Sequence, residues 1–594
     1  MSERLSWGLA LHPQALPLLH QLLERGLIDR IAAPADGNSW GPGELSRLFA
    51  DEWLRSQAFV AVGACGAITR LIAPQLSHKA TDPAVVVLDP AGRFAIPLLG
   101  GHGAGAEDLA QSIAALLGGE AVLTGSSQAR GQLALDSFGR RWGWRRGAGP
   151  WDALMKTAAH DQPLQLEHRE GSNRWLQLEG LPRAAASGPK LSVGVALDPT
   201  GACRWHPPAL WIGMGCERGT SLELLERALG RALADQGLAI EAVAGLATAD
   251  RKADEPALLQ LAQRHRWPLH CFSSNSLHQV EVPNPSAVVQ AELGTASVAE
   301  AAALLACGPG GALRLEKRIE RAAPGEQGAA TVAIAQAASQ WAPQRGRLHL
   351  IGSGPGRLDL LTPDARAALA ESSVWVGYGL YLDLLDPLRR PDQLRSDGQL
   401  TLERERCREA LELACQGLTV SLVSSGDSGI YGMAGLALEQ WMALAEHDQP
   451  AFEVHPGLSA VQLAAARAGA PLMHDFCTVS LSDRLTPWDV IERRLQAAAA
   501  GDFVVALYNP RSKGRDWQLG RAQELLLAER PGTTPVVLAR QLGRDEEHVS
   551  LHELGSLPLE QVDMLTLVLI GNSSSRVEAG RMVTPRGYPG AELS

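Results

Sequence analysis

Cysteine is scarce in this chain and never grouped. The 594 residues contain eight cysteines, and no two of them have the C-x-x-C spacing, which argues against zinc and iron–sulfur frameworks. We therefore expect no metal site. Their spread along the chain is typical of reduced thiols, so we expect a cytoplasmic protein.

Blocks of basic residues and long apolar runs are also missing. The net charge is −11 and no cluster of lysine and arginine stands out, so a surface that follows nucleic-acid phosphates is not expected. No run of about 18 apolar residues occurs, which argues against a membrane span, and the first residues lack the apolar core of a signal peptide. An anionic small-molecule substrate stays compatible with this composition, because a local positive pocket needs no positive total charge.

The sequence does contain a repeated alternation of short apolar strands and helical patterns. Residues 59–63 and 84–88 are typical of buried strands, and residues 106–117 are typical of a helix. This alternation predicts an α/β fold throughout. The chain is too long for one core, and about three to five domains are expected.

Changes in composition suggest where these domains meet. The middle region is rich in tryptophan, arginine and glycine and has little periodicity, and we expect its tryptophans to serve packing. We place a first α/β domain at 1–130, this middle region at 131–208, a further α/β domain at 209–336, a linker at 337–346, and two more α/β domains at 347–455 and 456–594.

A glycine-rich turn at 352–356 follows the apolar strand 348–351 and precedes a helix. Such a turn lets the backbone approach a ligand closely, and the helix start offers free N–H groups to it. The dinucleotide fingerprint G-x-G-x-x-G is not met, since Arg357 stands where its last glycine would be, and no phosphate-binding G-K-[ST] follows. A dinucleotide-dependent oxidoreductase is therefore the weaker alternative.

Four more loops marked by glycine or proline follow the first one. They span 424–432, 455–460, 507–512 and 584–588, and at least three of the five loops follow predicted strands. Ligands of open α/β sheets bind at the carboxyl ends of the strands. The five loops together therefore predict one shared cofactor site.

These loops resemble those of the tetrapyrrole methyltransferases, which use S-adenosylmethionine. Segments 485–488 and 508–511 favour the members that methylate precorrin-3B, or its cobalt counterpart, at C-17 in cobalamin biosynthesis. The resemblance implies two α/β domains with the methyl donor between them, and a reaction that also contracts the macrocycle. The most specific segments are 376–379, 424–432, 481–488, 508–512, 563–566 and 584–588.

The same resemblance implies which residues form the site. Methyl transfer requires alignment and exclusion of water rather than a nucleophilic triad, while Asp427, Tyr508 and Arg511 are candidates for acid–base help in the ring contraction. Each has a structural alternative: Asp427 as a turn residue, Tyr508 as a packing residue and Arg511 as a surface charge. The expected donor-binding residues are Gly354, Pro355, Gly356, Gly426, Asp427, Ile430, Ser459, Ala460, Leu507, Thr584 and Pro585.

Residues 55–125 and 210–335 resemble the cobalt-precorrin-5A hydrolases. The matching segments include 79–85, 98–106 and 213–220. The family opens a lactone on the contracted ring and releases acetaldehyde, so the resemblance implies His102 as a catalytic residue, with Glu107 or Glu255 as further candidates. Glu107 stands where the family usually has asparagine, so a non-catalytic module that binds and hands over the tetrapyrrole is the alternative.

Together the two resemblances predict a bifunctional enzyme of cobalamin biosynthesis. Its partner would be a tetrapyrrole substrate, with or without cobalt, and neither nucleic acid nor a membrane is expected. The family also implies a homodimer, and neighbouring enzymes of the pathway are candidate partners.

Overall fold

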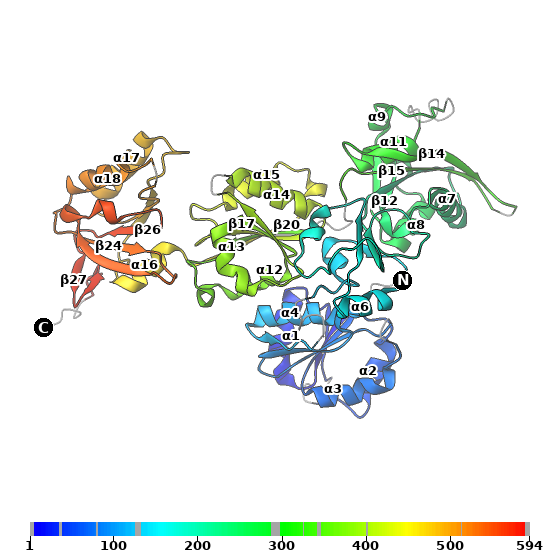
Figure 1. Ribbon diagram of the computed structural model, residues 1–594, viewed down its shortest axis with the longest axis horizontal. Coiled ribbons are helices and arrows are strands. Elements are labelled where there is room, and N and C mark those ends of the chain that lie inside the picture. The colour runs from blue at the N-terminus through cyan, green and yellow to red at the C-terminus, as the bar shows by residue number, and fades with distance from the viewer. Residues whose placement is uncertain are drawn as a thin grey trace.

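The computed structural model describes residues 5–34, 39–78, 81–124, 132–286, 297–324, 326–340, 346–399, 402–512 and 514–588. The described residues form successive α/β units, which we call the first to fifth domains (Figure 1). The predicted α/β class is confirmed by these sheets. None of the described helices is both long and apolar enough to cross a membrane.

The first domain (5–124) is built on a sheet in the order β2-β1-β3-β4-β5-β6. Its central strands β3 and β4 are buried along their whole length, as expected for apolar strands covered by helices on both faces. Its elements are β1 (Ser6–Ala10), α1 (Leu16–Glu24), β2 (Arg30–Ala32), α2 (Glu44–Glu52), β3 (Ala58–Val62), α3 (Cys65–Ile72), β4 (Ala84–Leu88), β5 (Phe94–Leu99), α4 (Ala106–Leu117) and β6 (Glu120–Ala121).

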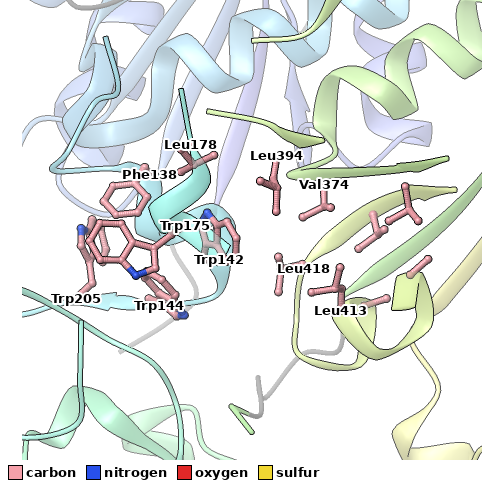
Figure 2. Packing of buried hydrophobic residues seen from close by; sticks show 14 of the residues in the cluster. Phe138, Trp142, Trp144, Trp175, Leu178, Trp205, Val374, Leu394, Leu413 and Leu418 are labelled. Carbon is pink, nitrogen blue, oxygen red and sulfur yellow. The ribbon is translucent and has the colours of Figure 1, made fainter. Parts of the chain in front are cut away.

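The second domain (132–206) packs a small sheet around tryptophan rings. Trp142, Trp175 and Trp205 are fully buried, and Phe138 lies between two of them, with ring centroids 5.7 Å from Trp175 and 5.8 Å from Trp205 (Figure 2). The prediction that these tryptophans serve packing is thus confirmed. The elements are β7 (Arg145–Arg146), α6 (Trp151–Ala159), β8 (Gln165–His168), β9 (Lys190–Val193) and β10 (Cys203–His206), with sheet order β7-β10-β9-β8.

The third domain (209–340) has the sheet order β13-β12-β11-β15-β14, and its β14–β15 hairpin extends outward at one end of the molecule (Figure 1). Gln340, the last described residue of this domain, is buried and donates hydrogen bonds to the carbonyl oxygens of Trp142 and Gln416. The elements are β11 (Leu210–Cys216), α7 (Leu222–Asp235), β12 (Val243–Ala249), α8 (Pro256–His265), β13 (Leu269–Phe272), α9 (Ser274–His278), α11 (Ala299–Cys307), β14 (Ala312–Arg321) and β15 (Ala329–Gln336).

The fourth domain (346–455) is a parallel sheet in the order β18-β17-β19-β16-β20. Its core is continuous with the tryptophan core of the second domain, because Trp142 and the sheet residues Val374 and Leu394 belong to one buried cluster (Figure 2). The elements are β16 (Arg347–Gly352), α12 (Pro363–Glu371), β17 (Val374–Tyr378), α13 (Gly379–Leu385), β18 (Leu394–Gly398), α14 (Glu403–Cys415), β19 (Thr419–Ser424), α15 (Ala434–Met442) and β20 (Ala451–His455).

The fifth domain (456–588) lies at the end of the molecule beyond the fourth (Figure 1). Its main sheet has the order β22-β23-β26-β24-β25, and a small sheet has the order β21-β28-β27. The elements are α16 (Ala460–Ala468), β21 (Gly469–Ala470), β22 (Phe476–Ser480), α17 (Trp488–Ala500), β23 (Val504–Tyr508), α18 (Gln518–Leu527), β24 (Pro535–Arg540), β25 (His548–Glu553), β26 (Thr566–Ile570), β27 (Arg576–Glu578) and β28 (Arg581–Val583).

Candidate active site

Three glycine-containing loops meet at one edge of the fourth domain. Strand β16 pairs in parallel with β19 on one side and with β20 on the other. The carboxyl ends of these strands therefore lie side by side, and the loops after them, 353–357, 425–433 and 456–459, converge. This is the position at which open α/β sheets bind ligands.

The three loops contact one another through backbone atoms. Gly354 and Gly426 exchange two backbone hydrogen bonds, of 3.0 Å and 2.8 Å. A Cβ atom on Gly457 would lie 2.6 Å from the carbonyl oxygen of Gly352 and closer still to that of Gly426. The loops can approach so closely only because Gly352 and Gly457 carry no side chains.

Asp427 ties two of these loops together. Its Oδ1 accepts a hydrogen bond of 2.8 Å from the backbone N–H of Gly429, in its own loop. Its Oδ2 accepts one of 3.0 Å from the backbone N–H of Gly457, in the loop after β20. Both carboxylate oxygens therefore hold backbone, which is the structural role that aspartate commonly has in turns.

Tyr508, at the end of β23, holds the start of helix α16. Its hydroxyl lies 2.6 Å from Oγ of Ser459, the N-cap residue, and accepts a hydrogen bond of 3.1 Å from the backbone N–H of Val461. Ser459 also forms a capping box with Gln462. Burial raises the pKa of Tyr508 despite these hydrogen bonds, so its phenol is neutral at neutral pH.

A cavity of about 200 Å³ lies between the fourth and fifth domains, above these loops. Its apolar side chains Ile430, Tyr431, Met564 and Leu565 are 38–52% exposed, an unusual degree for large apolar groups gathered at one place. It is lined by Pro355, Tyr381, Ser425, Gly426, Asp427, Ile430, Tyr431, Ser459, Ala460, Tyr508, Asn509, Ala539, Gln541, Leu542, Arg544, Met564, Leu565, Thr566 and Leu567.

Several polar residues of this cavity are not among those expected from the sequence. Tyr381 and Arg544 face it from the fourth and fifth domains, together with Asn509 and Gln541. Burial raises the pKa of Tyr381, although the positive charge of Arg544 opposes the shift. The position of Arg544 just beyond the end of β24 is a signal that could have identified it, because residues at strand ends border such sites.

Seven of the expected site residues line the cavity, and the others that the structure describes do not. Pro355, Gly426, Asp427, Ile430, Ser459, Ala460 and Tyr508 line the cavity together. Gly354 lies beneath it through its pairing with Gly426, and Gly356 packs against the carbonyl oxygen of Gly543. Leu507, fully buried in β23, is not among the lining residues.

Three more expected residues are not among those that line the cavity. Thr584 is buried beside the small sheet, with its hydroxyl 2.7 Å from Oγ of Ser575, and Pro585 follows it. Arg511 donates a hydrogen bond of 2.9 Å to the carbonyl oxygen of Leu559. The structure thus brings most of the expected loops to one place, while these three residues do not line the cavity found there.

A second cavity, of about 350 Å³, lies where the first, second and fourth domains meet. Glu107 lines it and lies against the turn at Gly101. Arg141 and Arg390 line it too, and both are ion-paired with Asp392, at 3.2 Å and 2.9 Å. The cavity therefore carries charged groups of both signs.

The other two candidates of the first half are not among the described residues that line this cavity. The side chain of His102 lies outside the part of the chain that the structure describes. Glu255 is in the third domain, where its Oε1 accepts a hydrogen bond of 2.9 Å from the backbone N–H of Gly219. Glu107 and Glu255 thus belong to different sites.

Comparison with protein families accounts for three parts of the chain. Residues 347–558 match the tetrapyrrole (corrin/porphyrin) methylases. Residues 47–128 match the family described as cobalamin synthesis G N-terminal, and residues 210–335 match cobalamin synthesis G C-terminus. Both resemblances expected from the sequence are confirmed by these matches.

Individual relatives agree with the methylase match. A protein named probable cobalt-factor III C(17)-methyltransferase, from Salmonella typhimurium, is 47% identical over 41% of this chain and 99% of its own length. A precorrin-3B C(17)-methyltransferase from a Sinorhizobium species is 42% identical over 41% of this chain and 98% of its own length. The crystal structure of the methyltransferase CobJ has 41% identity, covers 40% of this chain and 100% of its own, and has a TM-score of 0.39. The chain belongs to the tetrapyrrole methylases and carries in addition the two cobalamin synthesis G modules.

Proposed function

We propose that this chain transfers a methyl group from S-adenosylmethionine to C-17 of precorrin-3B or cobalt-factor III, with contraction of the ring. The observation that carries the proposal is the cavity between the fourth and fifth domains, whose floor consists of three loops in backbone contact. The cavity lies in the region that matches the methylases, and relatives that this chain covers almost completely bear the name C(17)-methyltransferase.

The residues present fit S-adenosylmethionine. The backbone of Gly352 and Gly426 fills the space beside Gly457, so the three loops form a close-packed floor on which a ligand can rest. Ile430 and Met564 offer apolar surface to an adenine ring, and Ala460 at the start of α16 offers a helix N-terminus to a carboxylate. Bound there, S-adenosylmethionine supplies an already activated methyl group, so the protein has to align the reactants and exclude water.

Arg544 and its neighbours are suited to bind the tetrapyrrole, which is the methyl acceptor. A tetrapyrrole of this kind carries many carboxylates, and a guanidinium binds them through charge-assisted hydrogen bonds. Arg544 lines the cavity beside Gln541, Asn509 and Tyr381. These side chains would hold the macrocycle beside the donor, while Asp427 and Tyr508 keep the loops in place.

Replacement of Asp427 with asparagine tests its role. The new amide would keep one acceptor, but its NH₂ group would face the N–H of Gly457 or Gly429 and leave that backbone donor unpaired. Such a loss costs about 1–3 kcal/mol, so we expect binding of S-adenosylmethionine to weaken about 10- to 100-fold, as measured by calorimetry. Asp516→Asn, at an exposed position of the fifth domain, is the control. Unchanged affinity with a reduced kcat would instead assign Asp427 to proton transfer.

The methylation itself is tested with the full chain. The protein is incubated with S-adenosylmethionine labelled in its methyl group and with metal-free precorrin-3B or cobalt-factor III in separate reactions. Mass spectrometry and NMR of the product are expected to place one labelled methyl group at C-17 in at least one reaction. Label at another ring position, or no transfer to either substrate, would refute the proposal.

We also infer that the first half opens the ring lactone. The support is the match of two segments to the cobalamin synthesis G family and the second cavity, which Glu107 lines together with Arg141 and Arg390. Glu107 could act as a general base there, with a guanidinium to stabilise the developing negative charge. Because the second domain shares its core with the fourth, this activity has to be measured in the intact chain.

The lactone-opening activity predicts release of acetaldehyde from a lactone-bearing cobalt-precorrin-5A by the full-length protein. Glu107→Gln is expected to lower kcat at least 100-fold, as a general base typically contributes about 10²–10⁴. Glu120→Gln, at an exposed position of the same domain, should have no effect. A wild-type protein that binds the substrate but forms no acetaldehyde would favour a carrier role for this half.

A further inference from the structure

Two buried histidines face each other in the fourth domain, on adjacent parallel strands. His349 of β16 stands beside Glu453 of β20 in the sheet register, and His455 follows two residues later. Side chains alternate along a strand, so all three leave the same face of the sheet. Nδ1 of His349 lies 3.0 Å from Nε2 of His455, and Oε2 of Glu453 lies 3.8 Å from each of these nitrogens.

The outer nitrogen of each imidazole has a carboxylate partner on helix α12. Oδ2 of Asp364 lies 2.6 Å from Nδ1 of His455 and forms a hydrogen bond with it. Oε1 of Glu371 lies 2.7 Å from Nε2 of His349, although it is out of line with the ring N–H. A carboxylate draws the ring proton to the nitrogen that it contacts, so we assign the protons to these outer nitrogens.

With the protons on the outer side, the inner nitrogens of His349 and His455 direct two lone pairs at each other. At 3.0 Å these lone pairs repel unless a cation lies near both. A carboxylate–histidine pair on each side of such a cation is the arrangement that orients histidine ligands of metal ions. Within the described residues, these histidines and Glu453 are the one group of potential metal ligands whose atoms lie within 4.8 Å of one another.

We propose that His349, His455 and Glu453 bind a divalent transition-metal ion of the Zn²⁺ class. Zinc–nitrogen bonds of about 2.0–2.1 Å at a tetrahedral angle separate the nitrogens by about 3.3 Å, so the rings need to move apart by only a few tenths of an ångström. Two imidazoles and one carboxylate are a donor set that zinc accepts readily.

The surroundings leave room for a fourth ligand and favour positive charge. His455 and Glu453 line a cavity of about 330 Å³ between the first and fourth domains, which can supply a water molecule. Four carboxylates and two guanidinium groups line this cavity: Glu24, Asp364, Glu371 and Glu453, with Arg25 and Arg347. The excess of negative charge therefore favours a divalent cation between the two imidazoles over an empty space there.

The ion would connect the cofactor site to the first domain. His349 lies three residues before Gly352, and His455 lies two before Gly457, so the metal would hold together the strand ends that carry two of the loops. Asp364, which contacts His455, is also ion-paired with Arg25 of the first domain. The site goes beyond methylation and lactone opening, since it brings the two halves of the chain into one bonded network.

The test measures metal bound to the full-length protein, produced without a histidine tag. After dialysis against a chelator and reloading with Zn²⁺, one ion per chain should remain through gel filtration, as determined by elemental mass spectrometry. Loading with Co²⁺ should give the visible absorption of a tetrahedral Co²⁺ site. Asp364→Asn, which removes an outer partner, is expected to weaken Zn²⁺ binding about 10- to 100-fold.

His349→Gln and His455→Gln are expected to lose the bound ion, and His474→Gln, at an exposed position, is the control. If the histidine variants fail to fold, Glu453→Gln serves as the second test, because the side chain of Glu453 is 44% exposed and its replacement disturbs the core little. The Co²⁺ spectrum of the Glu453→Gln protein must then differ from that of the wild type. The proposal is overturned if the folded wild-type protein retains no ion, or retains as much as the His349→Gln/His455→Gln double variant. A proton shared between the two rings would then explain the short distance between their nitrogens.

Discussion

Replacing Gly457 with alanine is expected to weaken binding of S-adenosylhomocysteine about 100-fold. The added methyl group would lie 2.6 Å from the carbonyl oxygen of Gly352 and nearer to that of Gly426. Both obstacles are backbone, so no side chain can rotate away, and the three loops have to separate. Overpacking costs about 1–3 kcal/mol, and the upper end corresponds to about a 100-fold loss of affinity, which calorimetry can measure.

Two further glycine variants separate this effect from a general loss of stability. Gly426 has a φ of +67° but a Cβ atom there would meet nothing closer than 3.8 Å, so Gly426→Ala adds backbone strain of about 1–2 kcal/mol and should weaken binding about 10-fold. Gly435→Ala, in helix α15 with open space around the new methyl group, should bind normally. Equal affinities for all three variants, in proteins that melt at the wild-type temperature, would contradict a site on these loops.

The second large effect is expected for Trp142→Ala, which should lower the stability of the second and fourth domains together by about 3–5 kcal/mol. Trp142 is fully buried, and its cluster extends into the sheet of the fourth domain (Figure 2). Ser373, next to β17, also donates a hydrogen bond of 2.9 Å to the carbonyl oxygen of Arg141. A cavity at Trp142 therefore weakens packing on both sides of the domain boundary.

Hydrogen exchange with mass spectrometry measures this coupling, because it reports each segment separately. Amides of β9 and β10 and amides of β16 and β19 are expected to lose protection together in the Trp142→Ala protein. Trp517→Ala, which removes a ring that is 50% exposed in the fifth domain, should leave both sets unchanged. Loss of protection in the second domain alone would show that the two cores are independent.

Local sequence patterns were sufficient for the elements that carry the glycine loops. The strand expected at 348–351 is β16 (Arg347–Gly352), and the turn after it lies where the spacing of its glycines indicates. Both signals are local, since an apolar run and a glycine turn are encoded by adjacent residues. The same holds for the expected resemblance to the methylases, which rests on short motifs.

Contacts between distant segments could not be predicted in this way. The strands of the second domain are two to four residues long, too short for a recognisable alternation, and rings from distant positions build its core. His349 and His455 meet across a strand pair although 106 residues separate them. Gln340 falls in the segment expected to be a linker, yet it is buried because residues of two other domains accept its hydrogen bonds. Register and domain packing, which fix these contacts, leave no periodic signal in the sequence.

Hydrogen exchange of the full-length protein with and without S-adenosylhomocysteine tests most directly whether the cavity between the fourth and fifth domains holds the methyl donor. Binding there should slow exchange in the peptides that contain 353–357, 425–431 and 459–461, and in the segment 541–544 across the cavity, while the first and third domains stay unchanged. No protection at saturating ligand, or protection confined to other domains, would contradict the account.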